Sequence, residues 1–297
     1  GLIITACVSV VRADSLGRTP QESQALVHLD RGEYKGARRL AEKSLSQSNT
    51  FIANFVLGVV HAEGEGNLAR GLYYVQRSKE MLLTEEGNPP ANPDARRWHK
   101  RVLLREQAIY GMMDRRDQQL NVLDQYDEHY APKLTARRIW PLLKLERFDE
   151  ARDLGKALVH NDEPVVRERA YNGLMAVEEE AGNRRQSYSW GLEGLKDTRG
   201  ESCIIATNLA LGARRTFQFA KAISHDTTAL QAQDGSCPTS PHAQLAAMYL
   251  VFGEFQQSLS SLKLLRSTPR PPDMRVQNEM VIRARFVELL LALGALD

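Results

Sequence analysis

The sequence predicts an all-α protein built as a solenoid of stacked helical hairpins. A short turn-like pattern, with a bulky residue and then a small one, returns along the chain about every 34 residues. Its copies include those that begin at Gly32, Gly66, Glu146, Gly182 and Gly253. Strand-like alternation of polar and apolar residues is rare, and β-branched residues are scattered. A fixed period of this length is typical of two-helix units that bury their apolar faces against their neighbours.

The composition agrees with an elongated repeat protein. The chain has 297 residues, of which 42% are hydrophobic, and this is enough for a continuous core. Charged residues make up 26%, but the net charge is only +2, which gives no electrostatic case for nucleic-acid binding. No apolar stretch reaches the 18 or so residues of a membrane-spanning helix, so we expect no complete span.

The first 19 residues are expected to hold a signal-peptide remnant, a lipid-modified cysteine and a tether. Ile4-Thr5-Ala6-Cys7 resembles the bacterial lipobox, in which an aliphatic residue and small residues precede the lipidated cysteine. This resemblance implies that residues 1–6 end a signal peptide and that Cys7 is the anchor. Val8 follows in place of an inner-membrane retention signal, which favours the outer membrane. The alternative is an apolar stub that caps the first repeat, with Cys7 as a buried thiol.

Helical hairpins are expected from Pro20 onward, since proline suits the first turn of a helix. Residues 20–83 form repeats one and two, with turns near Gly32 and Gly66. Residues 84–94 contain three prolines and a glycine, which predict a loop insertion between hairpins. This loop either contacts a partner or is a plain spacer, and we favour the spacer.

Residues 95–297 are expected to hold repeats three to seven and the start of an eighth repeat or a capping helix. The turns fall near positions 114, 146, 182, 215 and 253. The C-terminal segment 286–297 matches a first helix followed by a turn at Gly294. Its leucines are too closely spaced for a solvated cap, so this helix either packs in a groove or is followed by further sequence.

The pattern resembles the tetratricopeptide repeat (TPR), and the seventh copy shows it most cleanly. That copy has Leu245, Ala246 and Tyr249 on the first helix, Gly253 at the turn and Phe255 on the second helix. The resemblance implies a right-handed α-solenoid of about seven helix-turn-helix repeats plus a C-terminal helix. Together with the lipobox, the chain resembles bacterial outer-membrane TPR lipoproteins.

The same resemblance implies a concave binding surface lined by the first helix of each hairpin. Transfer of the family's inward positions by register gives Arg101, Lys133, Trp140, Arg169 and Asn172. Cationic side chains and a tryptophan are suited to hold an extended peptide and its carboxylates. Trp140 is alternatively a core residue, and the proline that follows it should kink the helix or shift its start.

Catalytic and metal-binding signals are weak, and no cofactor is expected. The chain has no zinc-protease, nucleophile-elbow or phosphate-loop motif, and no two of its seven histidines lie four residues apart. Cys203 and Cys237 are one repeat apart, which makes a disulfide between neighbouring repeats possible. Two separate thiols are the alternative.

Three classes of function are compatible with these observations. The favoured one is a non-catalytic adaptor that binds protein or peptide partners and is lipid-anchored at the outer membrane, facing the periplasm. The others are a cytosolic TPR regulatory module and the helical arm of a larger cell-wall enzyme. None of the three implies nucleic acid, and only the first implies contact with a membrane, through the anchor.

Overall fold

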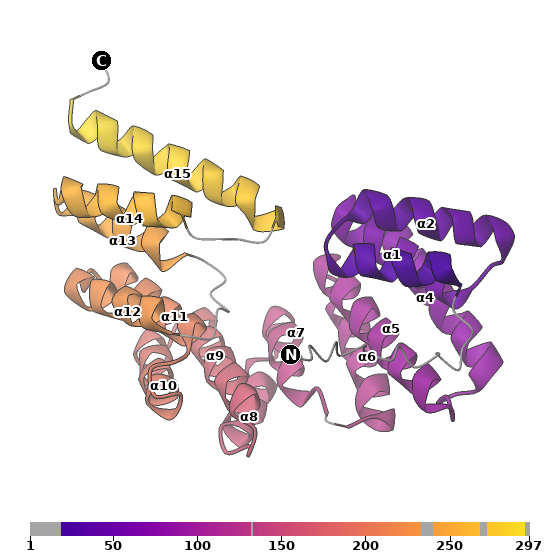
Figure 1. Ribbon diagram of the computed structural model, residues 1–297. Helices are drawn as coiled ribbons and strands as arrows, with labels where there is room; N and C mark the ends of the chain where they lie inside the picture. Colours follow the sequence, from indigo (N-terminus) through magenta and orange to yellow (C-terminus); the bar gives the residue numbers. More distant parts are fainter. Residues whose placement is uncertain (1–18, 132, 233–239, 268–271, 295–297) are drawn as a thin grey trace, which may run out of the picture. The chain divides into compact units, whose positions relative to one another are not determined.

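The computed structural model describes residues 19–131, 133–232, 240–267 and 272–294. All regular elements in these ranges are helical, and they form seven antiparallel hairpins followed by a single helix (Figure 1). The predicted all-α repeat fold is therefore confirmed. No helix in the described ranges is long and apolar enough to span a membrane. The chain divides into two compact units, residues 1–135 and 136–297, where the sequence suggested one continuous array.

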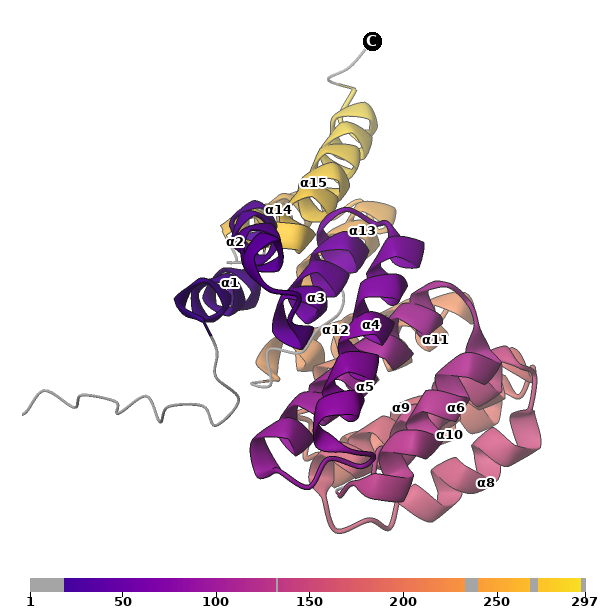
Figure 2. The ribbon, with the colours of Figure 1, turned by 90° about the vertical axis from the view of Figure 1, so that its right-hand side faces the viewer.

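Unit 1 consists of three hairpins. Its helices are α1 (Pro20–Asp30), α2 (Tyr34–Gln47), α3 (Phe51–Val59), α4 (Leu68–Glu86), α5 (Pro93–Met112) and α6 (Arg116–His129). Helix α3 continues into a π-helical turn, Val60–Gly64. Successive helices pack against each other, and Figure 2 shows α3 to α6 side by side.

The core of unit 1 contains a cluster of aromatic rings. Trp98 of α5 packs edge-on against Phe51 and Phe55 of α3, with ring centroids 5.6 and 5.4 Å apart. All three side chains are buried. Edge-to-face pairs of this kind add to the stabilisation that apolar burial provides. They join the second hairpin to the third.

The proline-rich insertion is shorter than the sequence suggested. Helix α4 runs to Glu86 and α5 begins at Pro93, so only residues 87–92 form the loop, rather than 84–94. The extra residues lengthen the helices, since α4 has 19 residues and α5 has 20. Pro93 occupies the first turn of α5, where its missing N–H costs nothing, and the side chain of Asn92 caps that turn.

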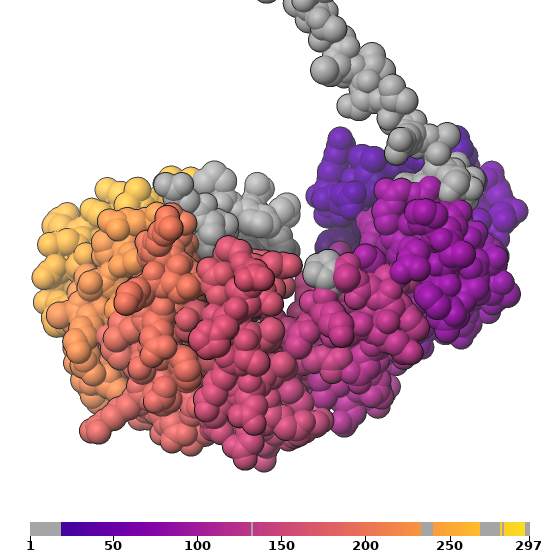
Figure 3. Space-filling model, turned by 90° about the horizontal axis from the view of Figure 1, so that it is seen from below, coloured from indigo at the N-terminus to yellow at the C-terminus, as the bar shows by residue number. Residues whose placement is uncertain are grey.

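Unit 2 holds four hairpins and the last helix. After a 3₁₀ turn (Thr135–Arg138) come α7 (Ile139–Lys144), α8 (Phe148–Leu158), α9 (Pro164–Glu180), α10 (Arg184–Asp197), α11 (Cys203–Arg215), α12 (Phe219–Gln231), α13 (Pro241–Val251), α14 (Phe255–Ser267) and α15 (Pro272–Ala292). On the surface of this unit the hairpins follow one another in chain order, from rose through orange to yellow (Figure 3).

Helix α7 shows how proline displaces a helix start. It is only six residues long, and Pro141 lies in its first turn. An N–H in the first turn has no partner within the helix, so proline is tolerated there. The expected shift of this helix start is confirmed.

Each hairpin turns through one residue with positive φ. These residues are Gly32, Gly66, Asp114, Glu146, Gly182, Phe217 and Gly253, and Gly294 follows the last helix. Six positions match the sequence prediction. The sixth turn was placed near Arg215 and is instead at Phe217, because an aromatic residue does not indicate a turn. Phe217 has φ +59° and is 80% exposed, an unfavourable conformation for a bulky L-residue.

Helix α15 packs on the last hairpin through one side. Leu289 and Ile282 are buried in a cluster with Ala246, Leu262 and Leu265 of α13 and α14. Other apolar side chains of α15 are exposed, including Val287 and Leu291. The helix therefore packs on the last hairpin through one side, and the two alternatives for its apolar character stay open.

Candidate functional site

The first helices of three hairpins in unit 2 line a pocket of about 450 Å³, which we call the inner pocket. Its side chains are Trp140 of α7, Asn172, Met175, Ala176, Glu179 and Glu180 of α9, Ser187 of α10, and Ile204, Asn208, Leu211, Gly212 and Arg215 of α11. On α9 and α11 the lining positions recur at intervals of about three and four residues. They therefore lie on one face of each helix.

Trp140 is the largest side chain of the inner pocket and is 48% exposed. This excludes the alternative that it is a core residue. The Nζ atom of Lys144, one turn later on α7, lies 5.1 Å from the Trp140 ring centroid. Leu211 is also exposed and Ile204 is half-buried. The pocket thus offers apolar surface to a ligand.

Two asparagines form the polar part of the inner pocket. The Nδ2 atom of Asn208 donates a hydrogen bond to Oδ1 of Asn172, 2.6 Å away. The remaining amide groups, Nδ2 of Asn172 and Oδ1 of Asn208, have no further partner among the described residues. One amide nitrogen and one amide oxygen therefore remain available in the pocket, and a peptide group has the acceptor and the donor to pair with them.

The charged residues that line the inner pocket are Glu179, Glu180 and Arg215, and Lys144 of α7 lies just outside the lining. Arg215 Nη1 lies 2.7 Å from Glu179 Oε1, and Lys144 Nζ lies 3.5 Å from Glu180 Oε1. Each cation therefore already has a carboxylate. The pocket is apolar with an amide pair, and it is close to electrically neutral.

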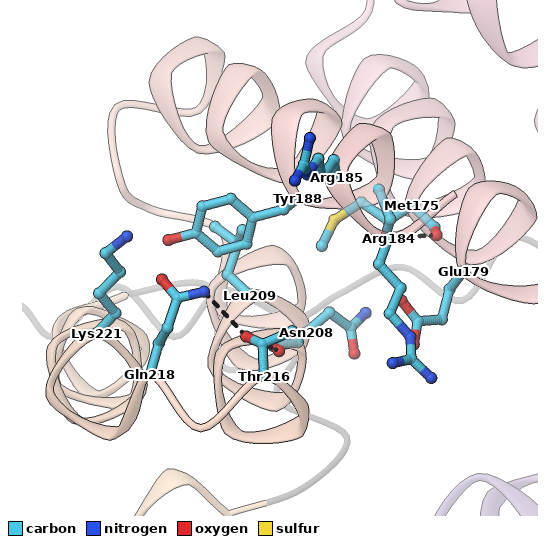
Figure 4. A pocket seen from close by; sticks show the side chains of 12 residues that line it. Met175, Glu179, Arg184, Arg185, Tyr188, Asn208, Leu209, Thr216, Gln218 and Lys221 are labelled. Atoms are coloured by element: carbon cyan, nitrogen blue, oxygen red, sulfur yellow. Dashed lines mark hydrogen bonds and ion pairs between the residues drawn. The ribbon is translucent and has the colours of Figure 1, made fainter. Parts of the chain in front are cut away.

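A second, smaller pocket of about 250 Å³ adjoins the inner pocket, and we call it the side crevice (Figure 4). The two share Met175, Glu179, Ser187, Asn208 and Gly212. The other lining residues of the side crevice are Arg184, Arg185 and Tyr188 of α10, Leu209 of α11, and Thr216, Gln218 and Lys221 in the turn and on α12.

Gly212 keeps the junction of the two pockets open. A Cβ atom added at this residue would have no neighbour within 4 Å. Glycine inside a helix is less stable than alanine, so Gly212 costs helix stability while it leaves the space beside it open. No packing requirement explains this glycine, and its effect is to leave room.

Two of the five binding residues predicted from the sequence meet in the inner pocket, namely Trp140 and Asn172. Arg169 lies on α9 but does not line either pocket, and its side chain is exposed. Arg101 and Lys133 belong to unit 1. Lys133 is exposed between helices.

Arg101 stacks on aromatic rings of unit 1. Its guanidinium lies 4.7 Å from the centroid of Trp98 and 5.4 Å from that of Phe55, and 3.8 Å from Asp30 Oδ1. These contacts give the arginine a structural role, since they link α5 to α3 and to the last residue of α1. The prediction that it binds a partner stays a prediction.

Sequence reasoning missed Asn208, Leu211 and Arg215. The turn residue of the sixth repeat is an aromatic, Phe217, which carries no turn signal, so its register was two residues off and Arg215 was assigned to the turn. A signal was nevertheless present, because Asn172 and Asn208 are separated by about one repeat length. Equivalent positions on successive first helices share a face.

Of the three cysteines, only Cys203 is among the described residues. Cys203 begins α11 and is buried. Cys237 and Cys7 are outside the described residues, so the disulfide and the lipid attachment stay predictions. Within the described ranges, no group of three His, Cys, Asp or Glu side chains is placed to hold a metal ion.

Comparison with known proteins identifies the fold and nothing finer. No family model matches the chain, and no curated protein matches it. A solved tetratricopeptide repeat protein from Parabacteroides merdae is similar, with a TM-score of 0.56 and 14% identity over 90% of this chain and 97% of that one. At this identity the likeness shows a shared TPR-type fold.

Two further solved structures are less similar. The Pseudomonas aeruginosa protein pilF has a TM-score of 0.37 and 15% identity, over 83% of this chain and 89% of its own. The TPR2AB domain of yeast Sti1, solved as a complex with pHSP90, has a TM-score of 0.35 and 14% identity, over 92% and 96%. Scores this low carry no argument about function.

Proposed function

We propose that this protein is a non-catalytic scaffold for protein–protein interaction and that unit 2 binds an extended peptide segment of its partner. The observation that carries the proposal is the inner pocket, where an exposed tryptophan lies beside a pair of asparagines with one free donor and one free acceptor. Largely apolar pockets with a few placed polar groups are the usual form of binding sites. The TPR-type fold presents such helix faces in a row.

The lining residues indicate how a segment binds. An apolar side chain packs on Trp140 and Leu211, while a main-chain amide bonds to Asn172 and Asn208. A tryptophan is a favourable anchor because it offers a large contact area with little loss of side-chain entropy. This mode differs from the carboxylate clamp inferred from the sequence, since Arg215, the cation that lines the inner pocket, is already paired with Glu179.

The test is a selection of random displayed peptides on the immobilised protein, followed by anisotropy titration of the selected sequences. Trp140→Ala should weaken binding by about 2 kcal/mol, the loss typical of a central aromatic anchor. Gly212→Leu should block the pocket by filling its open space. Leu192→Ala is the matched control, because Leu192 is an exposed apolar residue of unit 2 outside the pocket. Equal binding by all three variants would reject the inner pocket as the site.

The finer proposal is that the scaffold is lipid-anchored at the outer membrane and faces the periplasm. It rests on the lipobox-like sequence Ile4-Thr5-Ala6-Cys7 alone. Metabolic labelling with a palmitate analogue in a Gram-negative host checks it, with wild type compared to Cys7→Ser in the complete gene. Label that disappears with the substitution supports the anchor. An unlabelled wild-type protein would leave a scaffold without this attachment, as a cytosolic module would be.

A further inference from the structure

We propose that the side crevice is a second subsite, which selects an acidic partner segment with one bulky apolar side chain. This inference rests on the proposed function, since it names the class of peptide that the scaffold takes. The charges of the inner pocket are already paired, so a preference for a charged partner is expected from a neighbouring surface. The side crevice is that surface, because it adjoins the inner pocket and shares five residues with it.

The ionisable lining of the side crevice is unbalanced toward positive charge. Arg184, Arg185 and Lys221 face a single carboxylate, that of Glu179. Glu179 is already held by Arg215 at 2.7 Å, and Arg184 approaches it only to 3.9 Å. Arg185 and Lys221 have no carboxylate partner among the described residues. The first turns of α10 and α12 contain no acidic residue that would offset these cations.

The floor of the side crevice is apolar. Leu209 and Met175 are buried beneath it, and the ring of Tyr188 stands over Leu209 (Figure 4). The Tyr188 hydroxyl is 2.9 Å from Nε2 of His225, which fixes the ring. Burial, and then the charge of Lys221, lower the pKa of His225, so this imidazole is neutral near pH 7. It therefore adds no further charge to the crevice.

The arrangement fits a segment with acidic residues around an apolar one. Figure 4 shows Lys221 on one side of Leu209 and Arg184 on the other, so cations flank the apolar floor. The crevice, at about 250 Å³, is below the range of roughly 300–1,000 Å³ that holds drug-sized ligands. One large side chain fits it. Aspartates or glutamates on either side of that side chain would then reach the cations, and complementary charge sets specificity in such contacts.

The probe is a short labelled peptide that carries one leucine flanked on both sides by aspartate and glutamate in a glycine–serine background. Its affinity for the full chain is measured by fluorescence anisotropy. Three matched peptides replace the acids by their amides, replace them by lysine, or replace the leucine by glycine. The acidic peptide should bind more tightly than its amide form, by roughly fivefold for each ion pair made. Added salt should reduce this difference, since exposed pairs are screened.

The protein variants are Arg184→Glu with Arg185→Glu, and Lys196→Glu with Lys263→Glu as the control. Both double variants change the net charge equally, and Lys196 and Lys263 are exposed in unit 2 away from the crevice. The first should weaken the acidic peptide by at least tenfold and improve binding of the lysine peptide. The control should change either affinity by no more than about twofold.

Three results would overturn the proposal. These are equal affinity for the acidic and amide peptides, equal loss in the two double variants, and unchanged affinity after leucine is replaced by glycine. The last would mean a diffuse attraction of anions without use of the apolar floor. Failure here is separate from failure of the proposed function, because peptides selected on the inner pocket would still lose affinity with Trp140→Ala.

Discussion

A matched pair of glycine substitutions tests whether the two pockets are open as described. Gly194 lies three residues before the end of α10, and Gly212 lies three residues before the end of α11. Replacement by alanine raises helix propensity at both positions by up to about 1 kcal/mol. The surroundings differ. A Cβ at Gly194 would lie 2.7 Å from Cβ of Tyr171 and 2.8 Å from its Cγ, whereas one at Gly212 would have no neighbour within 4 Å.

The expected effects on stability therefore have opposite signs. Gly212→Ala should raise the free energy of unfolding by about 0.5–1 kcal/mol, since the methyl group enters open space. Gly194→Ala should lower it by up to about 2 kcal/mol, because overpacking costs roughly 1–3 kcal/mol and the gain in propensity offsets only part of this. The difference between the two variants isolates the packing cost.

Urea unfolding monitored by circular dichroism measures this difference, with thermal unfolding as a check. A change of 1 kcal/mol corresponds to a shift of about 2–4 °C in Tm for a domain of this size. Equal shifts for the two variants would refute the packing argument. Destabilisation by Gly212→Ala would show that other side chains occupy the space beside this face of α11. Both pocket proposals would then be wrong.

Other predictions concern stability and pH. Phe217→Gly should be about 1–2 kcal/mol more stable than Phe217→Ala in urea unfolding, because both remove the ring but only glycine relieves the positive φ; equal stability would contradict the strain. Ala37→Leu should destabilise by roughly 1–3 kcal/mol in the same assay, since Ala37 is fully buried, and no loss would contradict the packing of α2. Burial lowers the pKa of His99 to about 4, so its folded form stays neutral and stability falls by up to about 1.4 kcal/mol per unit as pH drops from 6.5 toward 4. Burial raises the pKa of Asp226 to about 7 despite its ion pair with Arg214, so stability falls by up to the same amount per unit as pH rises from about 4 to 7. Urea unfolding at several pH values measures how the free energy of unfolding changes with pH. His99→Gln should remove the loss of stability toward low pH, and Asp226→Asn should remove the loss toward neutral pH. An unchanged pH dependence in either variant would contradict the corresponding pKa shift.

The repeat fold and most of its turns could be predicted from the amino-acid sequence alone. A positive φ at a hairpin turn strongly favours glycine, so Gly32, Gly66, Gly182 and Gly253 could be found without a structure. Proline acts in the same local way, and Pro141 correctly indicated a displaced helix start. Phe217 escaped detection because its backbone conformation contradicts its residue type. The length of the loop at 87–92 was also not predicted, because proline is common both in loops and in the first turn of a helix such as α5.

The full set of side chains that forms the site could be identified only from the packing of the helices. Trp140 and Asn172 were found by register, but their partner Asn208 lies on a helix whose register depends on the unmarked turn. The net charge of the site also cannot be derived from the sequence, because Arg215 pairs with Glu179 on another helix. Arg185 has no such carboxylate partner among the described residues. Local backbone conformation depends on the type of each residue. The pairing of charges and the space beside Gly212 depend instead on contacts between helices that are distant in the sequence.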